Sequence, residues 1–417
     1  MRQIITPKNM CISCGACVFA SSGKIQLEEN KSVGMYLPNI IQKLSNQELI
    51  TIKNICPANG YKINSISKKL FDKKSEYDYR IGRYLNIVAV KSCSNKLLEK
   101  ASSGSIMTAL SMYLLDNKIV QGIAATIFTY NYDKVIPTTR IFTSSSDLLR
   151  TQGSKYMPVP ALMVLDEIIN FEGKVAFIGT PCQIAGLRLI QDNNPLLKEK
   201  IILTIGNFCG GFKDLRELNR LRTIAKMRKE NIIHFQYRGD GQPGKMLFQS
   251  KSGKKWERSY TRYGGLTGYM KHYRCRVCID ATAELADISC GDAWLPRFLN
   301  NGGNWSVVIV RNPEIQEYLS RMESDSIIKL EKIGIEELVF SQKENLTSKK
   351  ERYLSRNNFL KKTGHTLPVF DSGWNEKMNK SFFYEAKVYY AQLFKYYMEK
   401  IRLYSLLRLM VKTIIKD

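Results

Sequence analysis

Four cysteines near the N-terminus have the spacing of ligands for an iron–sulfur cluster. Cys11, Cys14 and Cys17 are separated by two residues each, and Cys56 is followed directly by Pro57. Three thiolates at two-residue gaps curl a loop so that all three point at one cubane cluster, and in bacterial ferredoxins a proline follows a ligand cysteine. The pattern therefore predicts one [4Fe–4S] cluster held by Cys11, Cys14, Cys17 and Cys56.

Two neighbouring residues bear on this prediction. Gly15 lies inside the run, where a residue without a side chain lets the backbone turn tightly past the inorganic sulfides. Ser21 occupies the position of the fourth cysteine in the bacterial ferredoxin run, and a serine is not expected to bind iron as a thiolate does. The alternative is a structural zinc site, but such sites usually contain paired CxxC motifs rather than a CxxCxxC run.

Five further cysteines are dispersed along the chain: Cys182, Cys209, Cys275, Cys278 and Cys290. Cys182 and Cys209 each follow a predicted strand, and ligands gather outside the carboxyl ends of strands in open α/β sheets. The CxxC motif of Cys275 and Cys278 can complete four thiolates around a second cluster, with Cys290 as a small core residue. Spacing alone leaves a second interpretation open, namely a zinc site at the CxxC motif with buried free thiols elsewhere.

The elements that must position these cysteines alternate between strand and helix. The residue patterns predict strands at 87–91, 119–129, 175–178 and 201–205, and helices at 106–117, 161–170, 183–191 and 211–230. The strand–helix–strand rhythm between residues 173 and 205 predicts a mostly parallel sheet. Residues 1–70 show little periodicity, residues 232–310 read as strand-rich, and basic helix is expected from about residue 340.

Length and composition exclude several classes of protein. A chain of 417 residues with 44% hydrophobic content can build two or three domains, so a wholly disordered chain is excluded. Ten cysteines are too few for a disulfide scaffold. We find no signal-peptide pattern and no apolar stretch of membrane-spanning length, so we expect a cytoplasmic protein with reduced thiols. Cys93 stands alone, and we expect it to be a buried, inert thiol.

Five sequence blocks resemble those of one known family. They are ASSGS at 101–105, GSKY at 153–156, FIGTPCQIAGL at 177–187, YRGDGQPG at 237–244 and ELADISCGDAW at 284–294. In this order they resemble the beta subunit of the coenzyme F420 hydrogenase/dehydrogenase family, which also includes 7-hydroxymethyl chlorophyll a reductase. The resemblance covers about residues 1–335.

Together with the predicted elements, the resemblance implies an α+β or α/β fold. We expect an N-terminal ferredoxin-like [4Fe–4S] segment at 1–70, a family N-terminal α/β region at 80–165, and a family C-terminal α/β region at 166–335 that carries the flavin and the second cluster. The central flavin domain would contain a mixed sheet. A basic helical extension is expected at 336–417.

The resemblance also implies the cofactors, which are two [4Fe–4S] clusters and FAD. It assigns the second cluster to Cys182, Cys209, Cys275 and Cys278, and it leaves Cys290 out. It assigns the flavin to a set of small, polar and aromatic residues: Ser102, Ser103, Gly104, Ser105, Gly153, Ser154, Lys155, Tyr156 and Thr180. Lys155 would act catalytically by stabilising the reduced flavin anion.

Elementary chemistry is compatible with part of this flavin assignment. Residues 102–105 open a predicted helix, and helix N-termini bind phosphate through free N–H groups, although an ordinary Ser/Gly cap is the alternative. Two segments depart from the family. Members often carry two glycines after the first Ser-Ser, where this chain has Gly104 and Ser105, and residues 279–282 lack the usual Pro-Asp-Gly. Because both lie near the expected flavin or substrate face, the substrate is not carried over.

The chain is strongly basic, with 63 Lys and Arg against 38 Asp and Glu and a formal net charge of +25. No nucleic-acid-binding motif accompanies this charge, so we expect no nucleic-acid partner. Residues 382–415 fit a basic amphipathic helix that contacts a partner protein or the inner face of a membrane peripherally. The alternative is a helix packed on its own domain. Occurrence of family members in cell-envelope polysaccharide gene clusters implies proximity to a membrane.

The leading functional interpretation is an enzyme. It would pass electrons between a ferredoxin or another acidic donor, two clusters and FAD, and it would reduce or oxidise a small organic substrate or a deazaflavin cofactor. The alternative is an electron-transfer subunit that docks on a separate catalytic subunit, and a homo-oligomer is compatible with either. A zinc-containing nucleic-acid-binding protein is a third interpretation, which bound iron would exclude.

Overall fold

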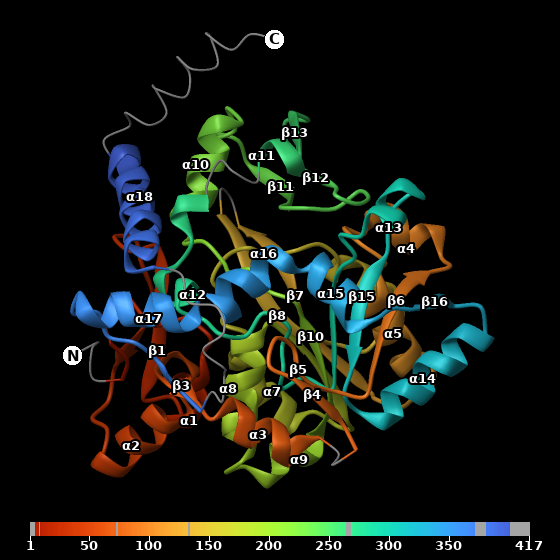
Figure 1. The fold of residues 1–417 in the computed structure, drawn as a ribbon, viewed down its shortest axis with the longest axis horizontal. Coiled ribbons are helices and arrows are strands. Elements are labelled where there is room, and N and C mark those ends of the chain that lie inside the picture. Colours follow the sequence, from red (N-terminus) through yellow and green to blue (C-terminus); the bar gives the residue numbers. More distant parts are fainter. Residues whose placement is uncertain are drawn as a thin grey trace.

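One eight-stranded mixed sheet forms the centre of the molecule (Figure 1). The structure is a computed structural model that describes residues 5–7, 9–71, 74–131, 134–263, 268–371 and 381–400. From edge to edge the strands are β16 (Ile328–Lys332), β6 (Asn86–Ser92), β15 (Ser306–Val310), β14 (Ile288–Asp292), β10 (Ile201–Asn207), β9 (Val175–Gly179), β7 (Gly122–Asn131) and β8 (Lys134–Phe142). All four strands expected from the sequence are confirmed.

The direction of the strands corrects one expectation. The neighbours β7–β9, β9–β10 and β10–β14 are parallel, whereas the remaining four pairings are antiparallel. The expectation of a mostly parallel sheet is therefore wrong, and the mixed sheet is confirmed. The error arises because the strand–helix–strand rhythm holds only for the central strands. β8 returns from β7 as a hairpin, and β6, β15 and β16 pair from distant parts of the chain.

Helices cover both faces of this sheet, and alternate residues of β9 pack toward opposite sides. Val175 and Phe177 pack on one face, whereas Ala176 packs on the other. Full burial of a large apolar side chain stabilises the fold by about 1.5–3 kcal/mol. The first face carries α7 (Leu165–Asn170), α8 (Pro181–Gln191) and α9 (Pro195–Lys200), and the second carries α5 (Ile106–Asp116) and α14 (Pro313–Ser324).

The N-terminal residues form an ordered unit beside the sheet. Its elements are α1 (Ala16–Ala20), β1 (Ile25–Asn30), β2 (Met35–Ile40), α2 (Asn46–Ile55), the 3-10 turn η2 (Pro57–Asn59), β3 (Gly60–Tyr61) and α3 (Ile63–Leu70). β1 and β2 pair antiparallel, and α1 packs on α8 and on the 3-10 turn η4 (Ala161–Val164). The sequence patterns missed the helices α2 and α3, which are 10 and 8 residues long.

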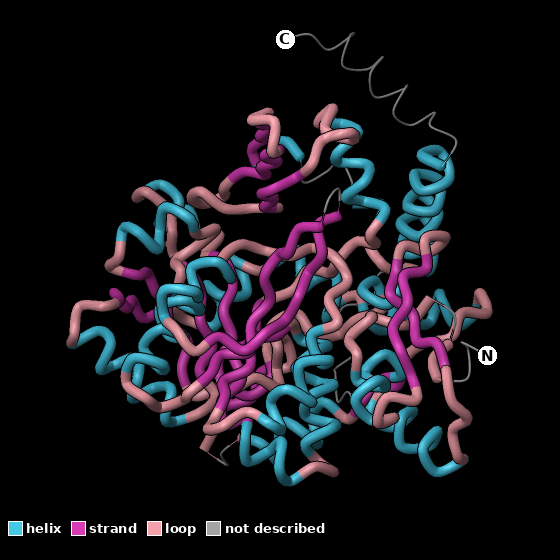
Figure 2. The backbone as a smooth tube through the Cα atoms, turned by 180° about the vertical axis from the view of Figure 1, so that it is seen from behind, coloured by secondary structure: helices cyan, strands magenta, loops and turns pink. Residues whose placement is uncertain are grey.

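A second, three-stranded sheet stands above the central one (Figures 1 and 2). It consists of β11 (Ile232–Gln236), β12 (Lys245–Ser250) and β13 (Lys255–Ser259), all antiparallel. Phe235, Tyr237 and Phe248 pack against α10 (Arg216–Ile224) in a separate small core. The helix expected at 211–230 is therefore confined to the middle of that range.

The C-terminal region packs partly on the central sheet and partly on the N-terminal unit. Its elements are α15 (Ile335–Ser341), α16 (Lys343–Leu346), the π-helical turn η6 (Thr347–Glu351), α17 (Tyr353–Lys362), β17 (Val369–Phe370) and α18 (Phe382–Lys400). β17 pairs in parallel with β3, and the Asp371 carboxylate accepts hydrogen bonds from the backbone N–H groups of Asn64 and Ser65, both at 2.9 Å. Residues 401–415 of the expected C-terminal helix lie outside the described residues.

Short elements complete the fold. They are β4 (Glu76–Asp78), β5 (Gly82–Tyr84), α4 (Asn95–Lys100), α6 (Ser145–Leu148), η3 (Leu149–Thr151), α11 (Tyr260–Tyr263), η5 (Gly268–Met270), α12 (Tyr273–Arg276) and α13 (Pro296–Asn300). None of the helices in the described part of the chain combines the length and apolar character that crossing a bilayer requires.

Candidate functional site

The main cavity, of about 480 Å³, lies at the carboxyl ends of the parallel strands. Residues from the ends of β9, β10 and β14 line it, together with the start of α5 and the loop after η3. In open α/β sheets, ligands gather at the carboxyl ends of the parallel strands. The predicted cysteine and flavin residues lie at this same edge of the sheet.

Four dispersed thiols meet in this cavity. Cys182 begins α8, Cys209 follows β10, Cys275 lies in α12 and Cys278 follows it, and all four line the cavity. Burial, followed by the neighbouring Cys209 and Cys275, raises the pKa of Cys182 to about 12. Cys290 also lines the cavity, but burial raises its pKa and the charge acting on it is that of Arg311. All five cysteines therefore line one cavity, and mutual repulsion acts among the four thiols expected from the sequence, whereas Arg311 acts on Cys290.

A second, smaller cavity is lined by Cys11, Cys14, Cys17 and Cys56. Burial raises the pKa of all four thiols, that of Cys11 to about 12, and Cys56 adds repulsion on each of the other three. The backbone N–H of Ser13 donates to Cys11 Sγ at 3.4 Å. The loop therefore directs four thiols and a backbone donor at one place.

Gly15 and Ser21 have structural roles in this loop. The φ angle of Gly15 is +90°, and a Cβ added there would lie 2.7 Å from the Cγ atom of Met163, so the position requires glycine. Ser21 donates to the carbonyl of Val18 at 2.9 Å and accepts from the N–H of Ile25 at 3.0 Å. Its hydroxyl thus caps α1 and starts β1, which agrees with a ligand set that excludes Ser21.

The donor chemistry of both sets suits an iron–sulfur cluster better than a single metal ion. Among the described residues, no three His, Cys, Asp or Glu side chains are arranged to hold one ion. Thiolates on a single zinc ion, each about 2.3 Å from the metal, must nearly touch one another. Four partly or fully buried thiols around a cavity fit a larger group that contains iron and sulfide, and [4Fe–4S] clusters take four thiolates.

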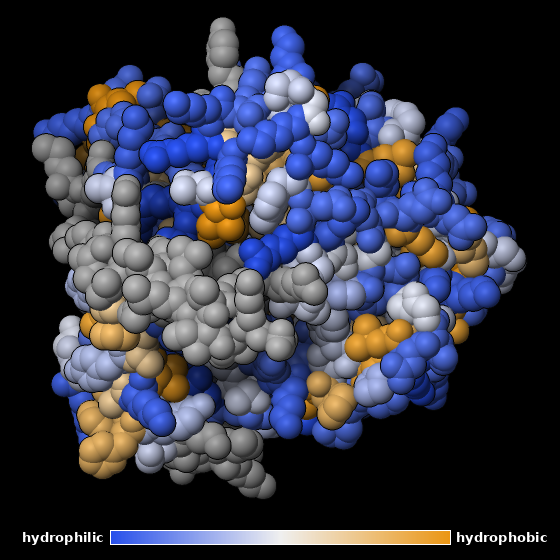
Figure 3. Space-filling model, turned by 90° about the horizontal axis from the view of Figure 1, so that it is seen from above, coloured by the Kyte–Doolittle hydropathy of each residue, from blue (hydrophilic) through white to orange (hydrophobic). Residues whose placement is uncertain are grey.

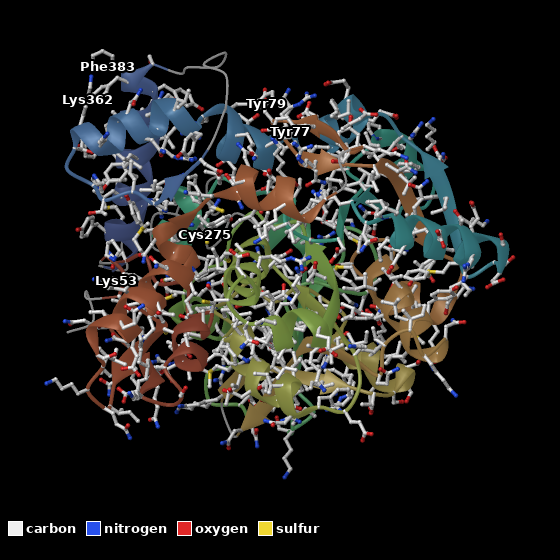
Figure 4. The ribbon with its side chains drawn as sticks, turned by 90° about the horizontal axis from the view of Figure 1, so that it is seen from below. Lys53, Tyr77, Tyr79, Cys275, Lys362 and Phe383 are labelled. Atoms are coloured by element: carbon white, nitrogen blue, oxygen red, sulfur yellow. The ribbon has the colours of Figure 1, made fainter. Side chains whose placement is uncertain are left out.

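The two thiol sets are joined by buried residues. Ile12 lines both cavities. Arg274, which is 2% exposed, donates from Nε to the carbonyl of Ala58 at 3.0 Å and from Nη2 to the carbonyl of Pro57 at 2.9 Å. Because Pro57 follows Cys56 and Arg274 precedes Cys275, the loops of the two sets are bonded to each other. Figure 4 shows Cys275 within the body of the molecule, beside the C-terminal helices.

The expected flavin residues lie along the wall of the main cavity, with one exception. Ser102, Ser103 and Ser105 line it, whereas Gly104 does not. Gly104 instead allows close packing of backbones, since an added Cβ would lie 2.2 Å from the carbonyl oxygen of Val90. Its N–H donates to Ser306 Oγ at 3.0 Å. The Ser/Gly segment is thereby fixed at the start of α5.

Lys155 closes the neighbouring loop. Its ammonium donates to the carbonyls of Thr151, Gln152 and Gly153 at 2.5, 3.2 and 2.9 Å. Burial lowers the pKa of Lys155 to about 7, but three carbonyl acceptors match the three N–H donors of an ammonium and favour the charged form. Lys155 therefore presents a fixed positive charge at the wall, while its contact with a flavin stays a prediction.

The remaining expected residues also line the cavity: Gly153, Ser154, Tyr156 and Thr180. Gly153 has a φ angle of +82°, which the sharp turn of this loop requires. The hydroxyl of Thr180 lies 3.5 Å from Cys182 Sγ, and its backbone N–H donates to Gln183 Oε1 at 2.8 Å. Thr180 thus starts α8 and contacts the first thiol of the second set.

Sequence reasoning missed Arg238, which joins three walls of the main cavity. Its Nη1 donates to Asp292 Oδ2 at 2.5 Å and its Nη2 donates to the carbonyl of Ser102 at 2.7 Å. The guanidinium lies over the rings of Tyr260 and Trp294, at 4.7 and 5.2 Å from their centroids. Arg238 lies in the YRGD block and Asp292 in the GDAW block, which were the available signal for this contact. Nothing in either block indicates that the two segments are adjacent in the fold.

Two lysines beside the second thiol set were also missed. Lys271 and Lys349 both line the cavity, and Lys349 Nζ lies 3.6 Å from Cys278 Sγ. Burial opposes ionisation of Cys278, but Lys349 and Arg274 outweigh it and leave the pKa of this thiol below its ordinary value. The position of Lys271, four residues before Cys275, could have indicated a place beside the thiol set. No sequence feature indicated that Lys349 lies there. The expectation for Cys93 is wrong, because this thiol is exposed where the chain leaves β6.

Two family models match the chain over more than half its length. The model described as coenzyme F420 hydrogenase/dehydrogenase, beta subunit N-term, matches residues 87–166, and the corresponding C-terminus model matches residues 172–335. The coenzyme F420 hydrogenase subunit beta of Methanococcus voltae is 24% identical over 262 residues, which cover 60% of this chain and 86% of that protein. The F420-dependent formate dehydrogenase subunit beta of Methanocaldococcus jannaschii is 23% identical over 59% of this chain and 62% of that protein.

A solved structure shares the fold. A chain in the structure of the F420-reducing [NiFe] hydrogenase complex from Methanosarcina barkeri superimposes with a TM-score of 0.53 at 23% identity, covering 68% of this chain and 96% of that one. The named relatives are subunits of hydrogenases and formate dehydrogenases, that is, of oxidoreductases. This chain belongs to the coenzyme F420 hydrogenase/dehydrogenase beta subunit family.

Proposed function

We propose that this protein is an iron–sulfur flavoprotein oxidoreductase. It passes electrons between an acidic donor such as a ferredoxin, two [4Fe–4S] clusters and FAD, and it reduces or oxidises an organic substrate or a deazaflavin cofactor. The observation that carries this proposal is the pair of four-thiol sets, joined through Arg274 and Ile12, of which the second opens on the main cavity. The names of the relatives support the class of reaction.

The chain offers separate residues for each group. Cys11, Cys14, Cys17 and Cys56 would hold the first cluster, Cys182, Cys209, Cys275 and Cys278 the second, and the wall from Ser102 to Ser105 and from Gly153 to Tyr156 the flavin. Clusters supply one-electron transfer and a flavin supplies two-electron chemistry. Ile12 fills the space between the two cavities with an apolar side chain. Arg274 fixes the position of the two cysteine loops relative to each other.

Arg238 orients the wall at which a flavin or substrate would bind. Its hydrogen bonds fix Asp292 and the Ser102 carbonyl, and Tyr260 and Trp294 cover its guanidinium. Because Arg238 is paired with Asp292, the protonated form of Lys155 supplies the unpaired positive charge of this wall, which suits an anionic ligand such as a pyrophosphate or a reduced flavin. The N-terminus of α5 adds free backbone N–H groups and the positive end of a helix dipole, and both favour a bound anion.

A second candidate function is an electron-transfer subunit of a larger complex. The relatives are named as beta subunits, and the matching structure is one chain of a hydrogenase complex. In this case the cavity would serve a cofactor that is shared with a separate catalytic chain. Turnover of a substrate by the isolated protein with a reduced ferredoxin distinguishes the enzyme from the subunit.

The outer face of α18 supports a peripheral contact with an anionic membrane. Phe383, Tyr390 and Phe394 follow one another at seven and four residues on one face of the helix, and they are 83%, 55% and 61% exposed. Exposed Lys387 and Lys395 lie on the same helix. Figure 4 shows Phe383 at the outer edge of the molecule, and Figure 3 shows that the face seen from above is largely hydrophilic.

The proposed function is tested by anaerobic purification followed by iron, sulfide and flavin analysis. Two [4Fe–4S] clusters require about eight iron atoms per chain, with one FAD. Cys182→Ala is expected to lose about four of them, and Cys290→Ala, a buried thiol of the same cavity, is expected to keep all. Protein that contains zinc and no iron would overturn the proposal. Retention of every iron atom in Cys182→Ala would overturn the second ligand set.

A further inference from the structure

Residues beyond those that the family models match complete the second thiol site. The matched residues end at 335, yet Gln342, Asn345 and Lys349 line the main cavity. Lys349 comes from the π-helical turn η6 and is 2% exposed. Single π-helical turns occur frequently at functional sites because they place side chains where an α-helix does not.

The ammonium of Lys349 is held directly at one thiol. Its Nζ lies 3.6 Å from Cys278 Sγ and donates to the carbonyl of Asp280 at 2.7 Å. The Asp280 carboxylate is engaged elsewhere, by the backbone N–H groups of Thr282 and Glu284. The carbonyl of Asp280 therefore fixes the direction of the ammonium toward the sulfur.

The next lysine shows by contrast what is unusual at Lys349. Lys350 is equally buried, but it forms a salt bridge with the carboxylate of Glu284. Among the described residues no salt bridge to Lys349 is found, and its close partners are a sulfur atom and a carbonyl. A buried cation requires a compensating negative charge, and a thiolate at Cys278 provides it.

We propose that Lys349 is a positioning residue that stabilises the reduced state of the second cluster by donating a hydrogen bond and a positive charge to Cys278 Sγ. The inference rests on the proposed function, since it requires a cluster on Cys278. Hydrogen bonds to the sulfur ligands and nearby positive charge favour the more negative, reduced form of a cluster and raise its reduction potential. The C-terminal region of this chain thereby contributes to the reduction potential of the second cluster.

The test compares Lys349→Met with the wild-type protein by redox titration monitored with electron paramagnetic resonance. Methionine has similar length but neither charge nor N–H donor. We expect both clusters to be retained and the reduction equilibrium constant of the second cluster to fall at least tenfold, which is 59 mV for a one-electron couple. The first cluster provides an internal reference that should not change. Lys361→Gln removes one exposed charge from the same region and should leave both potentials unchanged.

A second variant keeps the inference falsifiable if Lys349→Met fails to assemble. Lys349→Gln retains an N–H donor without the charge, and we expect an intermediate fall of its equilibrium constant. Both clusters present with an unchanged second potential in either variant would overturn the role of Lys349. Wild-type protein that lacks the second cluster would instead overturn the proposed function, so the two failures are distinguishable by iron content.

Discussion

Arg274 Nη2 donates a hydrogen bond of 2.9 Å to the carbonyl oxygen of Pro57 and thereby joins the two cysteine loops. Pro57 directly follows Cys56, and Arg274 directly precedes Cys275. The two residues are 217 positions apart in sequence, so this bond exists only when the N-terminal unit has docked on the central sheet. The hydrogen bond therefore fixes where the two thiol sets lie relative to each other in the folded protein.

The first prediction concerns the loss of this bond. Arg274→Met leaves the carbonyls of Pro57 and Ala58 buried without their donors, and each unsatisfied group is expected to destabilise the protein by about 1–2 kcal/mol. Chemical denaturation under anaerobic conditions should therefore show a free energy of unfolding lower by about 2–4 kcal/mol. Arg297→Gln, at an exposed position, is the control. Equal stability of both variants and the wild type would show that the bond does not hold the loops together.

The second prediction is a loss of stability in acid that originates at His272. Burial, together with Arg274 and Arg276, lowers the pKa of His272 to about 3, whereas the unfolded imidazole titrates near 6.5. Between these values the unfolded chain binds a proton that the folded chain does not, so stability falls as pH decreases from 6.5 toward 3. The loss between pH 7 and pH 5 is about 2 kcal/mol from this group.

His272→Phe isolates this contribution. The phenyl ring can keep the stacking on Phe212, whose ring centroid lies 5.2 Å from that of the imidazole. We expect the difference in unfolding free energy between pH 7 and pH 5 to be smaller in the variant by about 2 kcal/mol. Iron content is measured at both pH values so that loss of clusters is recognised. An unchanged difference would mean that the pKa of His272 is not lowered in the folded protein.

Local patterns indicated the first thiol set, whereas for the second set spacing left a zinc site open and the family resemblance selected the four cysteines. The CxxCxxC run and the CxxC motif are contiguous, and Cys182 and Cys209 follow strands whose carboxyl ends must meet in a parallel arrangement. Cys93 shows the limit of this reasoning. It also follows a buried strand, β6, and yet its thiol is exposed.

Long-range contacts explain what the sequence did not reveal. Lys349 reaches Cys278 across 71 positions, and Arg238 reaches Asp292 across 54. Neither contact follows from spacing, since both depend on how separate elements pack on the sheet. The region from residue 336 onward was expected as a basic helical extension, with no expectation of buried lysines. The burial of Lys349 and Lys350 could be recognised only in three dimensions.

The third prediction separates flavin binding from cluster binding. Arg238→Gln removes the salt bridge to Asp292 and one donor to the Ser102 carbonyl at the cavity wall. We expect FAD content to fall at least tenfold while all iron is retained, because the thiol sets do not contact Arg238 in the structure. Flavin fluorescence after denaturation and iron analysis measure the two contents. Full flavin content in this variant would exclude Arg238 from the flavin site, and loss of both groups would indicate general misfolding.

The last prediction concerns the exposed aromatic face of α18. The inner face of this helix is anchored by polar bonds: Glu385 accepts from Arg352 at 2.9 and 2.6 Å, and Gln392 accepts from Arg276 at 2.8 Å. The anchored inner face leaves the outer phenylalanines available for insertion into a bilayer surface, and the basic residues favour anionic lipid.

Replacing Phe383 and Phe394 together by serine should therefore weaken sedimentation with vesicles of anionic phospholipid by at least tenfold, since each buried phenylalanine contributes about 1.5–3 kcal/mol. Phe340→Ser is the matched control, because Phe340 is 57% exposed on α15, away from α18. Vesicles of neutral phosphatidylcholine should bind weakly in all cases. If the double variant sediments as strongly as the wild type, or if neutral vesicles bind equally well, an anionic membrane is not what covers this face.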